Sequence, residues 1–160
     1  MSEEDQEFKD YEAFAKKMED AYPRMFGGHY GGFACGKGWW PLLEKLCATI
    51  QSHIDWANDT RTALLLSNPY GHTIPDAVEQ VVVQQIKEKF GTLRFYYDGG
   101  DDYIRGATTL AENLTGHLCE ECGGLGTRRG GGWVRTLCDT HEQEHQARQE
   151  KYAKENGLEL

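Results

Sequence analysis

The chain has 160 residues and a formal net charge of −9, with 39% hydrophobic and 27% charged residues. This composition fits one domain with a packed core and excludes a wholly disordered chain. The acidic balance excludes nonspecific coating of DNA, because a negative chain repels phosphate backbones. The longest apolar run, at residues 63–66, is too short to span a bilayer, and the N-terminus shows no secretory signal, so we expect a cytoplasmic protein without membrane contact.

Two helices are predicted in the N-terminal part. Residues 6–22 place apolar side chains at spacings of three and four, which is typical of an amphipathic helix that ends before Pro23. After a glycine-rich loop, a second helix is predicted from about Trp39, with Pro41 in its first turn. Residues 58–77 are predicted to be mainly loop. The expected buried faces are Phe8, Tyr11, Ala15, Met18 and Tyr22 in the first helix, and Leu42, Leu43, Leu46, Cys47, Ile50, Ile54 and Ala57 in the second.

A β-hairpin is predicted at residues 78–97, with a turn near Gly91. Its second strand alternates, so that Leu93, Phe95 and Tyr97 share one face. In its first strand the expected inward set is Val82, Ile86 and Phe90. A third helix follows at 101–117, with an apolar face of Ile104, Ala107, Ala111, Leu114 and Leu118.

The outward face of this hairpin carries Lys87, Lys89, Arg94 and Tyr96. Cations beside an aromatic ring are able to grip a phosphate and stack a base, so this face is a candidate nucleotide site. The alternative is an ordinary solvated strand face, which is where charged residues usually lie.

The C-terminal part carries a metal-ligand pattern. Cys119 and Cys122 form a CxxC pair, and Cys138 and His141 form a CxxH pair fifteen residues later. Thiolates and a neutral imidazole at this spacing indicate one tetrahedral zinc ion. Because four protein ligands leave no open coordination position, we expect this zinc to be structural. The alternatives are a disulfide and unligated core thiols. Disulfides are rare in an intracellular chain, and core thiols do not explain the paired spacing.

Short strands are predicted at 125–128 and 133–137, joined by glycines 130–132, and a polar helix follows to about residue 155. A knuckle, a hairpin and a helix that carries the second ligand pair resemble the treble-clef zinc finger. The predicted fold class is therefore α+β, with helices packed on a β-hairpin in a body of residues 1–118 and a treble-clef-like module at 119–155.

The metal-ligand region also matches two catalytic sites in part. His141 to His145 match the HExxH motif of metallopeptidases, but His141 is already the natural partner of the three cysteines. A narrower alternative is that His145 replaces His141 as the fourth ligand. Treble clefs also host HNH-type nucleases, but the hairpin here has no histidine. Its arginines, Arg128, Arg129 and Arg135, are instead candidate phosphate contacts, unless Glu120, Glu121 and Asp139 neutralise them.

Two further cysteines are interpreted separately. Cys47 lies on an apolar helical stripe and is expected to be a core thiol. Cys35 lies among glycines beside Lys37, so we expect an exposed thiol whose pKa is open to lowering.

Several segments together resemble a family of small zinc-binding proteins of tailed bacteriophages and prophages. These are Gly38-Trp39-Trp40 with LLEKLCATIQSHIDW, then QIKEKFGTLRFYYDGGDDYI, CEECGGLG and GGWVRTLCDTH, over residues 20–145. The resemblance implies a phage accessory protein whose zinc ligands fall on the four positions named above. It implies no catalytic residue.

The sequence thus favours a zinc-stabilised accessory protein that binds a host or phage macromolecule in the cytoplasm of the infected cell. A protein is the expected partner, and interference with a host defence is one expected outcome. The first alternative is a nucleotide-binding sponge that uses the hairpin face, and the second is a metal-dependent HNH-like nuclease. No pattern shows that the chain is an enzyme.

Overall fold

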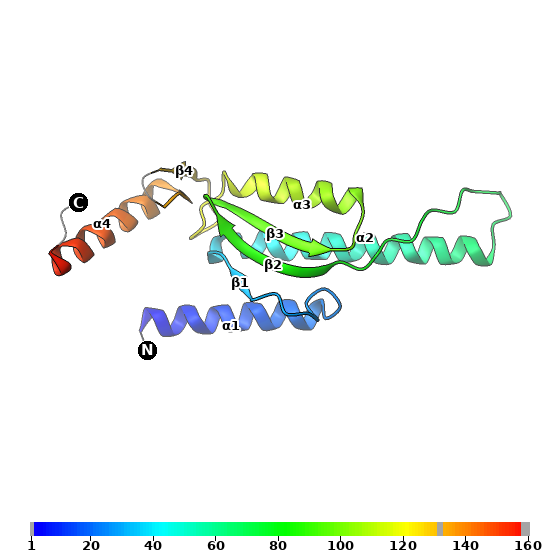
Figure 1. Cartoon of the computed structure of the whole chain (residues 1–160), viewed down its shortest axis with the longest axis horizontal. Coiled ribbons are helices and arrows are strands. Elements are labelled where there is room, and N and C mark those ends of the chain that lie inside the picture. The colour runs from blue at the N-terminus through cyan, green and yellow to red at the C-terminus, as the bar shows by residue number, and fades with distance from the viewer. Residues whose placement is uncertain (1, 131–132, 158–160) are drawn as a thin grey trace.

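The computed structural model describes residues 2–130 and 133–157, and over these it has an α+β fold of four α-helices and two small sheets (Figure 1). The helices are α1 (Glu3–Ala21), α2 (Trp40–Leu66), α3 (Asp102–Thr115) and α4 (Asp139–Asn156). The strands are β1 (Phe33–Ala34), β2 (Val82–Lys89), β3 (Thr92–Asp98), β4 (Thr127–Arg129) and β5 (Arg135–Leu137). A short 3-10 helix, η1 (Lys37–Trp39), leads into α2. No helix in the described ranges is both long enough and apolar enough to cross a membrane.

Helix α1 begins three residues earlier than predicted because Ser2 and Asp5 form a capping box. The Ser2 hydroxyl accepts from the Asp5 N–H at 3.2 Å, and the Asp5 carboxylate accepts from the Ser2 N–H at 2.9 Å. Phe14 and Met18 are buried, whereas Phe8, which was predicted to be buried, is 62% exposed. The first turns of α1 project beyond the start of α2 (Figure 1).

Helix α2 begins as predicted, with Pro41 in its first turn and the predicted stripe from Leu43 to Ala57 buried. The prediction that residues 58–77 are mainly loop is confirmed from Ser67 onward but was wrong for 58–66, because the helix continues to Leu66. The Asn58 side chain explains how this end is held. Its amide donates to the Val78 carbonyl and its oxygen accepts from the Val78 N–H, both at 2.9 Å, which ties the returning chain to the helix.

The main sheet has the order β1-β2-β3, with β1 parallel and β3 antiparallel to β2. The predicted inward face of β3 is confirmed for Leu93 and Phe95, which are buried, and Tyr97 packs against the core. For β2 the prediction holds only at Ile86. A β-bulge between Val83 and Gln85 shifts the register, so Val83 is buried, while Val82 is only half-buried and Phe90 is exposed.

One apolar core joins three helices to the inner face of this sheet. Helix α3 contributes Ile104 and Ala111 as predicted, but the predicted Leu114 is 42% exposed. The other members come from α1, α2, the sheet and the loop before β1: Phe14, Met18, Met25, Phe26, Tyr30, Phe33, Trp39, Leu43, Leu46, Cys47, Ile50, Ile54, Val81, Val83, Ile86, Leu93 and Phe95. This core fixes the end of α3, and Cys119 follows four residues after that end.

Strands β4 and β5 pair antiparallel, from Thr127 opposite Leu137 to Arg129 opposite Arg135. Strand β5 lies within the second predicted strand, whereas β4 overlaps the first and extends one residue past its predicted end at 128. Residues 131–132 of the predicted glycine turn fall outside the described residues. Helix α4 follows directly and ends one residue past the predicted limit. The C-terminal segment thus consists of a turn, a hairpin and a helix at one end of the body (Figure 1).

Candidate metal centre

Four potential metal ligands meet between the end of α3, the β4–β5 hairpin and the start of α4. They are the four residues predicted from their spacing: Cys119, Cys122, Cys138 and His141. One ligand atom from each lies within 4.8 Å of the others, and His141 Nδ1 lies 3.1 Å from Cys138 Sγ and 3.4 Å from Cys119 Sγ. Ligands bound about 2.0–2.3 Å from a tetrahedral ion are about 3.3–3.8 Å apart. The donor set therefore fits one metal ion.

A tight backbone turn presents the first ligand pair. The Cys119 N–H donates to the Gly124 carbonyl at 2.7 Å, and the Gly123 N–H donates to the Cys119 carbonyl at 2.8 Å. Gly123 has a φ of 74°, and a Cβ there would lie 2.6 Å from the Gly38 carbonyl oxygen. Both the dihedral angle and the packing therefore require glycine at this position.

The backbone around Cys119 favours its thiolate form, which is the form that binds metal. Burial raises the pKa of this thiol, but N–H groups of Cys138, Cys122 and Glu121 donate to the sulfur and bring the pKa down to about 7. The Gly124 N–H lowers the pKa of Cys122, but burial and the adjacent Cys119 thiol outweigh it and raise that pKa. Thiolates at this spacing repel one another, and a bound cation removes that repulsion.

The second ligand pair lies at the start of α4, where Cys138 precedes the first turn and His141 lies within it. His141 directs Nδ1 at the thiols, and its Nε2 lies 3.9 Å from the Glu144 carboxylate, which helps to orient the ring. His145, the alternative fourth ligand, lies outside the cluster, with its Nε2 3.0 Å from the Gln149 side-chain nitrogen. The structure thus favours His141 and does not assemble an HExxH site.

The first ligand pair is docked directly on the N-terminal half of the chain. The Gly38 N–H donates to the Glu120 carbonyl at 2.8 Å, and the buried Trp39 indole donates to the Leu118 carbonyl at 2.8 Å. A Cβ on Gly38 would collide with the carbonyl oxygens of Cys119 and Glu120. Backbone therefore packs on backbone here, and the metal cluster is built against the body rather than joined to it by a linker.

A partly buried ion-pair network braces the same contact. Glu120 is 6% exposed, accepts from the Gly36 N–H at 3.1 Å and lies 3.4 Å from the Arg135 guanidinium. Arg135 also binds Glu121 at 2.7 Å. Burial raises the pKa of Glu120, and the charge of Arg135 opposes that rise. The network links β5 to the turn that carries Cys119 and Cys122.

The three arginines predicted as phosphate contacts all have partners within the protein. Arg135 is held by the two glutamates just described, Arg129 pairs with Asp139, and Arg128 donates to the Phe90 carbonyl at 2.6 Å. Neutralisation by carboxylates, the alternative reading of the sequence, is therefore observed for Arg129 and Arg135. Their structural role explains their presence without a nucleic acid.

The four residues of the predicted basic-aromatic face lie on the outer side of the β2–β3 hairpin. Lys87 pairs across the strands with Arg94, and Lys87 Nζ lies 5.5 Å from the centre of the Tyr96 ring. Lys89 instead lies over the ring of Phe90, also at 5.5 Å. The structure thus brings Lys87, Arg94 and Tyr96 together and turns Lys89 toward the end of the hairpin.

An exposed aromatic patch at this hairpin end was missed by the sequence analysis. Phe90 has a φ of 54°, which is rare for an aromatic residue, and is 62% exposed, while Trp133 is 73% exposed. With Glu88, Lys89 and Val134 they line a hollow of about 290 Å³, and we call these five residues the hairpin-tip patch. The Thr136 hydroxyl donates to the Gly91 carbonyl at 2.6 Å and fixes the turn to β5. The Lys89–Thr92 pairing places the two-residue turn at Phe90 and Gly91, as predicted, but the packing of Phe90 beside Trp133 had no local signal.

The remaining cysteines are inert. The prediction of an exposed Cys35 with a lowered pKa was wrong, because burial beside Glu120 raises the pKa of this thiol to about 12. The prediction for Cys47 is confirmed, since it is fully buried in α2 and burial raises its pKa to about 12. Neither residue belongs to the metal cluster.

Comparison of the chain with protein-family models, curated proteins and solved structures finds no match in any of the three. The resemblance to phage proteins therefore stays a prediction. Any statement on function depends on the geometry of the cluster and the surfaces around it.

Proposed function

We propose that the protein is a zinc-stabilised binding protein, in which one structural zinc ion holds the C-terminal segment on the body and so presents the hairpin-tip patch to a partner protein. Three thiolates and one imidazole are the donors that zinc prefers. Four protein ligands complete a tetrahedron and leave no open position for substrate or water. The zinc therefore stabilises the fold and does not catalyse.

The order of elements supports a treble-clef-like module. The turn with Cys119 and Cys122 comes first, the β4–β5 hairpin second, and α4 brings Cys138 and His141 in at its start. In this arrangement the metal links the two ends of the hairpin. Its binding free energy thus becomes folding free energy for the segment.

The observation that carries the binding role is the hairpin-tip patch. It combines two exposed aromatic side chains from separate hairpins, and Trp is among the residues that contribute most to protein interfaces. Phe90 adopts a left-handed conformation that costs about 1–2 kcal/mol, although its exposed ring gains little from folding. Strain at an exposed aromatic residue is better explained by a contact with a partner than by stability.

The phage resemblance supplies the class of partner. A protein of the host or the phage is the expected occupant, and interference with a host defence is one consequence of such binding. The acidic net charge favours a partner with a basic surface, because opposite charges accelerate association.

The test combines metal analysis with affinity capture from lysate of infected host cells. We expect about one zinc per chain and a discrete captured protein that is lost with Trp133→Ala. Tyr152→Ala removes a similarly exposed ring from α4 and serves as the matched control, with capture retained. Absence of zinc from the folded protein refutes the metal proposal, and equal capture by the two variants refutes the role of the patch.

A second candidate, binding of a nucleotide on the outer hairpin face, is favoured by the grouping of Lys87, Arg94 and Tyr96. If it is correct, nucleotides should raise the melting temperature of the wild-type protein, because a ligand of the native state stabilises it. Arg94→Ala should abolish that rise, whereas Lys16→Ala, on the surface of α1, should not. An unchanged melting temperature with millimolar nucleotide counts against this candidate.

A further inference from the structure

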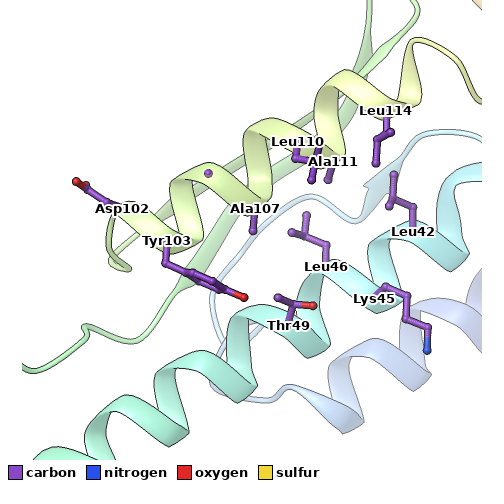
Figure 2. Close-up of a pocket in the computed structure, with 11 residues that line it drawn as sticks. Leu42, Lys45, Leu46, Thr49, Asp102, Tyr103, Ala107, Leu110, Ala111 and Leu114 are labelled. Carbon is purple, nitrogen blue, oxygen red and sulfur yellow. The ribbon is translucent and has the colours of Figure 1, made fainter.

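A long apolar groove between α2 and α3 takes no part in the metal cluster or the hairpin-tip patch. It has a volume of about 550 Å³, and Figure 2 shows side chains from both helices directed into it. Its lining includes Leu42, Lys45, Gly106, Ala107, Leu110 and Leu114. A second hollow of about 560 Å³ extends it along α2 to Trp56 and shares Lys45, Thr49 and Tyr103 with the first.

Several large apolar side chains along this groove are exposed to solvent. Leu110 is 61% exposed, Leu114 42%, Tyr103 56% and Trp56 68%. They form one row over two helices rather than scattered surface residues, and such rows mark sites of contact. The groove lies between two helices, so a third helix can pack along it.

The pattern of side-chain size along α3 fits a second α3 that crosses it antiparallel. In such a crossing Ala107 of each copy faces Leu110 of the other, so a large side chain meets a small one on both sides of the two-fold axis. Tyr103 of each copy then meets Leu114 of the other and closes the contact at both ends. Gly106 leaves open space beside this row, since a Cβ there would have no neighbour within 4 Å. A two-fold contact requires this kind of self-complementarity.

The charges along the groove are self-complementary in the same orientation. Figure 2 shows that α2 and α3 run antiparallel, with Leu42 beside Leu114 and Thr49 beside Tyr103. Lys45 therefore lies toward one end and Asp102 at the other, and an antiparallel two-fold axis brings Lys45 of one copy toward Asp102 of its partner. Lys45 makes no ion pair with any residue in the described ranges. Asp102 pairs with Arg105 of its own helix at 2.8 Å, and both side chains of that pair are exposed, so Asp102 stays accessible to a second cation.

We propose that two copies of this chain associate through these grooves, so that α2 and α3 of both form an antiparallel four-helix interface. Four-helix packing of this kind buries a shared apolar stripe from each helix pair. The groove itself carries charges of both signs, and salt screens the repulsion between two acidic chains beyond about 10 Å. The inference is independent of the proposed zinc and partner, because none of these groove residues lies in either site.

Sedimentation velocity of the full-length, metal-loaded protein tests this proposal. Over about 5–200 μM, a range that brackets weak association, we expect the wild type to shift from the 18.1 kDa monomer to twice that mass. Leu110→Arg and Gly106→Arg should weaken the dimer at least tenfold, because both place a charge at the helix contact. Neither should harm the fold, since Leu110 is exposed and position 106 has open space. Thr109→Arg adds the same charge to another exposed position of α3 and should dimerise like the wild type.

A charge exchange makes the orientation testable. Lys45→Asp alone should weaken the dimer, and Lys45→Asp combined with Asp102→Lys should restore it, because these two residues of the described structure form no ion pair within one copy. A wild type that stays at 18.1 kDa throughout the range overturns the proposal, as does equal dimerisation of the Leu110→Arg and Thr109→Arg variants. Capture of a foreign helical protein by a monomeric wild type would likewise assign the groove to a different occupant.

Discussion

The body of the protein and the C-terminal segment that carries the candidate metal ligands are stabilised by different physics. Every member of the main buried cluster lies between residues 14 and 111, so the body folds around apolar side chains that leave water. In the described residues beyond 118, the buried hydrophobic side chains are only Cys119, Leu137 and Ala153. So small an apolar surface cannot offset the conformational entropy of ordering this segment.

The segment is ordered instead by directional contacts. The four candidate metal ligands meet between its two ends, the Glu120–Arg135 pair braces the turn, and the Thr136 hydroxyl donates to the Gly91 carbonyl and so anchors β5. Such contacts form only at defined distances, whereas apolar packing tolerates some change of shape. The two regions should therefore respond differently to metal removal, to added volume, to pH and to changes in strain.

Removal of the proposed zinc should have the largest effect. Structural zinc sites contribute on the order of 10 kcal/mol of binding free energy, so Cys138→Ser or a chelator should unfold the segment. Hydrogen exchange followed by mass spectrometry should show loss of protection in β5 and α4, while α2 and β3 stay protected. His145→Ala, outside the cluster, should leave both zinc content and exchange unchanged. Unaltered protection of the chelated protein would show that the segment does not need metal.

Added volume at the contact between the two regions should have the second largest effect on stability. Gly38→Ala places a methyl group against the carbonyl oxygens of Cys119 and Glu120, so we expect a loss of about 1–3 kcal/mol in the free energy of unfolding. Gly106→Ala is the matched control, because its Cβ meets no atom within 4 Å in an exposed helix and should stabilise by up to about 1 kcal/mol. Urea unfolding of the metal-loaded proteins measures both. Equal stability of the two variants would mean that the backbone at this contact shifts to accept a methyl group at little cost in free energy.

Acid should act on the body through the start of α3. Burial raises the pKa of Asp101, but the hydrogen bond with His53 and the one from the Ile104 N–H outweigh it, so the pKa lies below the usual 3.8. A depressed carboxyl pKa stabilises the fold above the unfolded value, and this stability is lost as pH falls through the folded value.

Asp101→Asn keeps a helix-capping side chain but removes the charge. At pH 7 the variant should be less stable than the wild type by about 1 kcal/mol, and the difference should shrink below about pH 4. Urea unfolding of both proteins at a series of pH values gives this difference. A gap that persists at pH 3 would exclude the carboxylate charge as its source.

Periodicity predicted those parts of the fold that local sequence determines. The stripe on α2 was correct because one face of a long helix packs on one core, with Pro41 marking its start. The inward set of β2 was wrong because the bulge after Val83 is defined by the pairing with β3 and has no local signal. Residues 58–66 were predicted as loop together with the turn-forming residues Asn68, Pro69 and Gly71 that follow them. The contact that holds this end of the helix, between Asn58 and Val78, spans 20 positions and has no local signal.

The candidate site was likewise predictable only where short stretches of sequence determine it. The four ligands were predictable because each pair lies within one turn and the chemistry of the metal requires the spacing. The segment that docks on them was not, since Gly36 contacts Glu120 across 84 positions of sequence. The hairpin-tip patch also joins two hairpins, so neither Phe90 nor Trp133 reveals it alone.

Relief of strain at the end of the β2–β3 hairpin should give the smallest effect, and one of opposite sign. Asn adopts the left-handed conformation of residue 90 far more readily than Phe, which relieves about 1–2 kcal/mol. Phe90→Asn also loses the contact with the Lys89 ammonium, worth about 0.5–1 kcal/mol at an exposed site. The variant should therefore be more stable by about 0.5 kcal/mol, whereas Phe90→Ala keeps the strained conformation and should lose stability. If urea unfolding shows the gain for Phe90→Asn while affinity capture shows weaker partner binding, the strain is retained for binding. A variant that binds as well as the wild type and is more stable would remove Phe90 from the proposed interface.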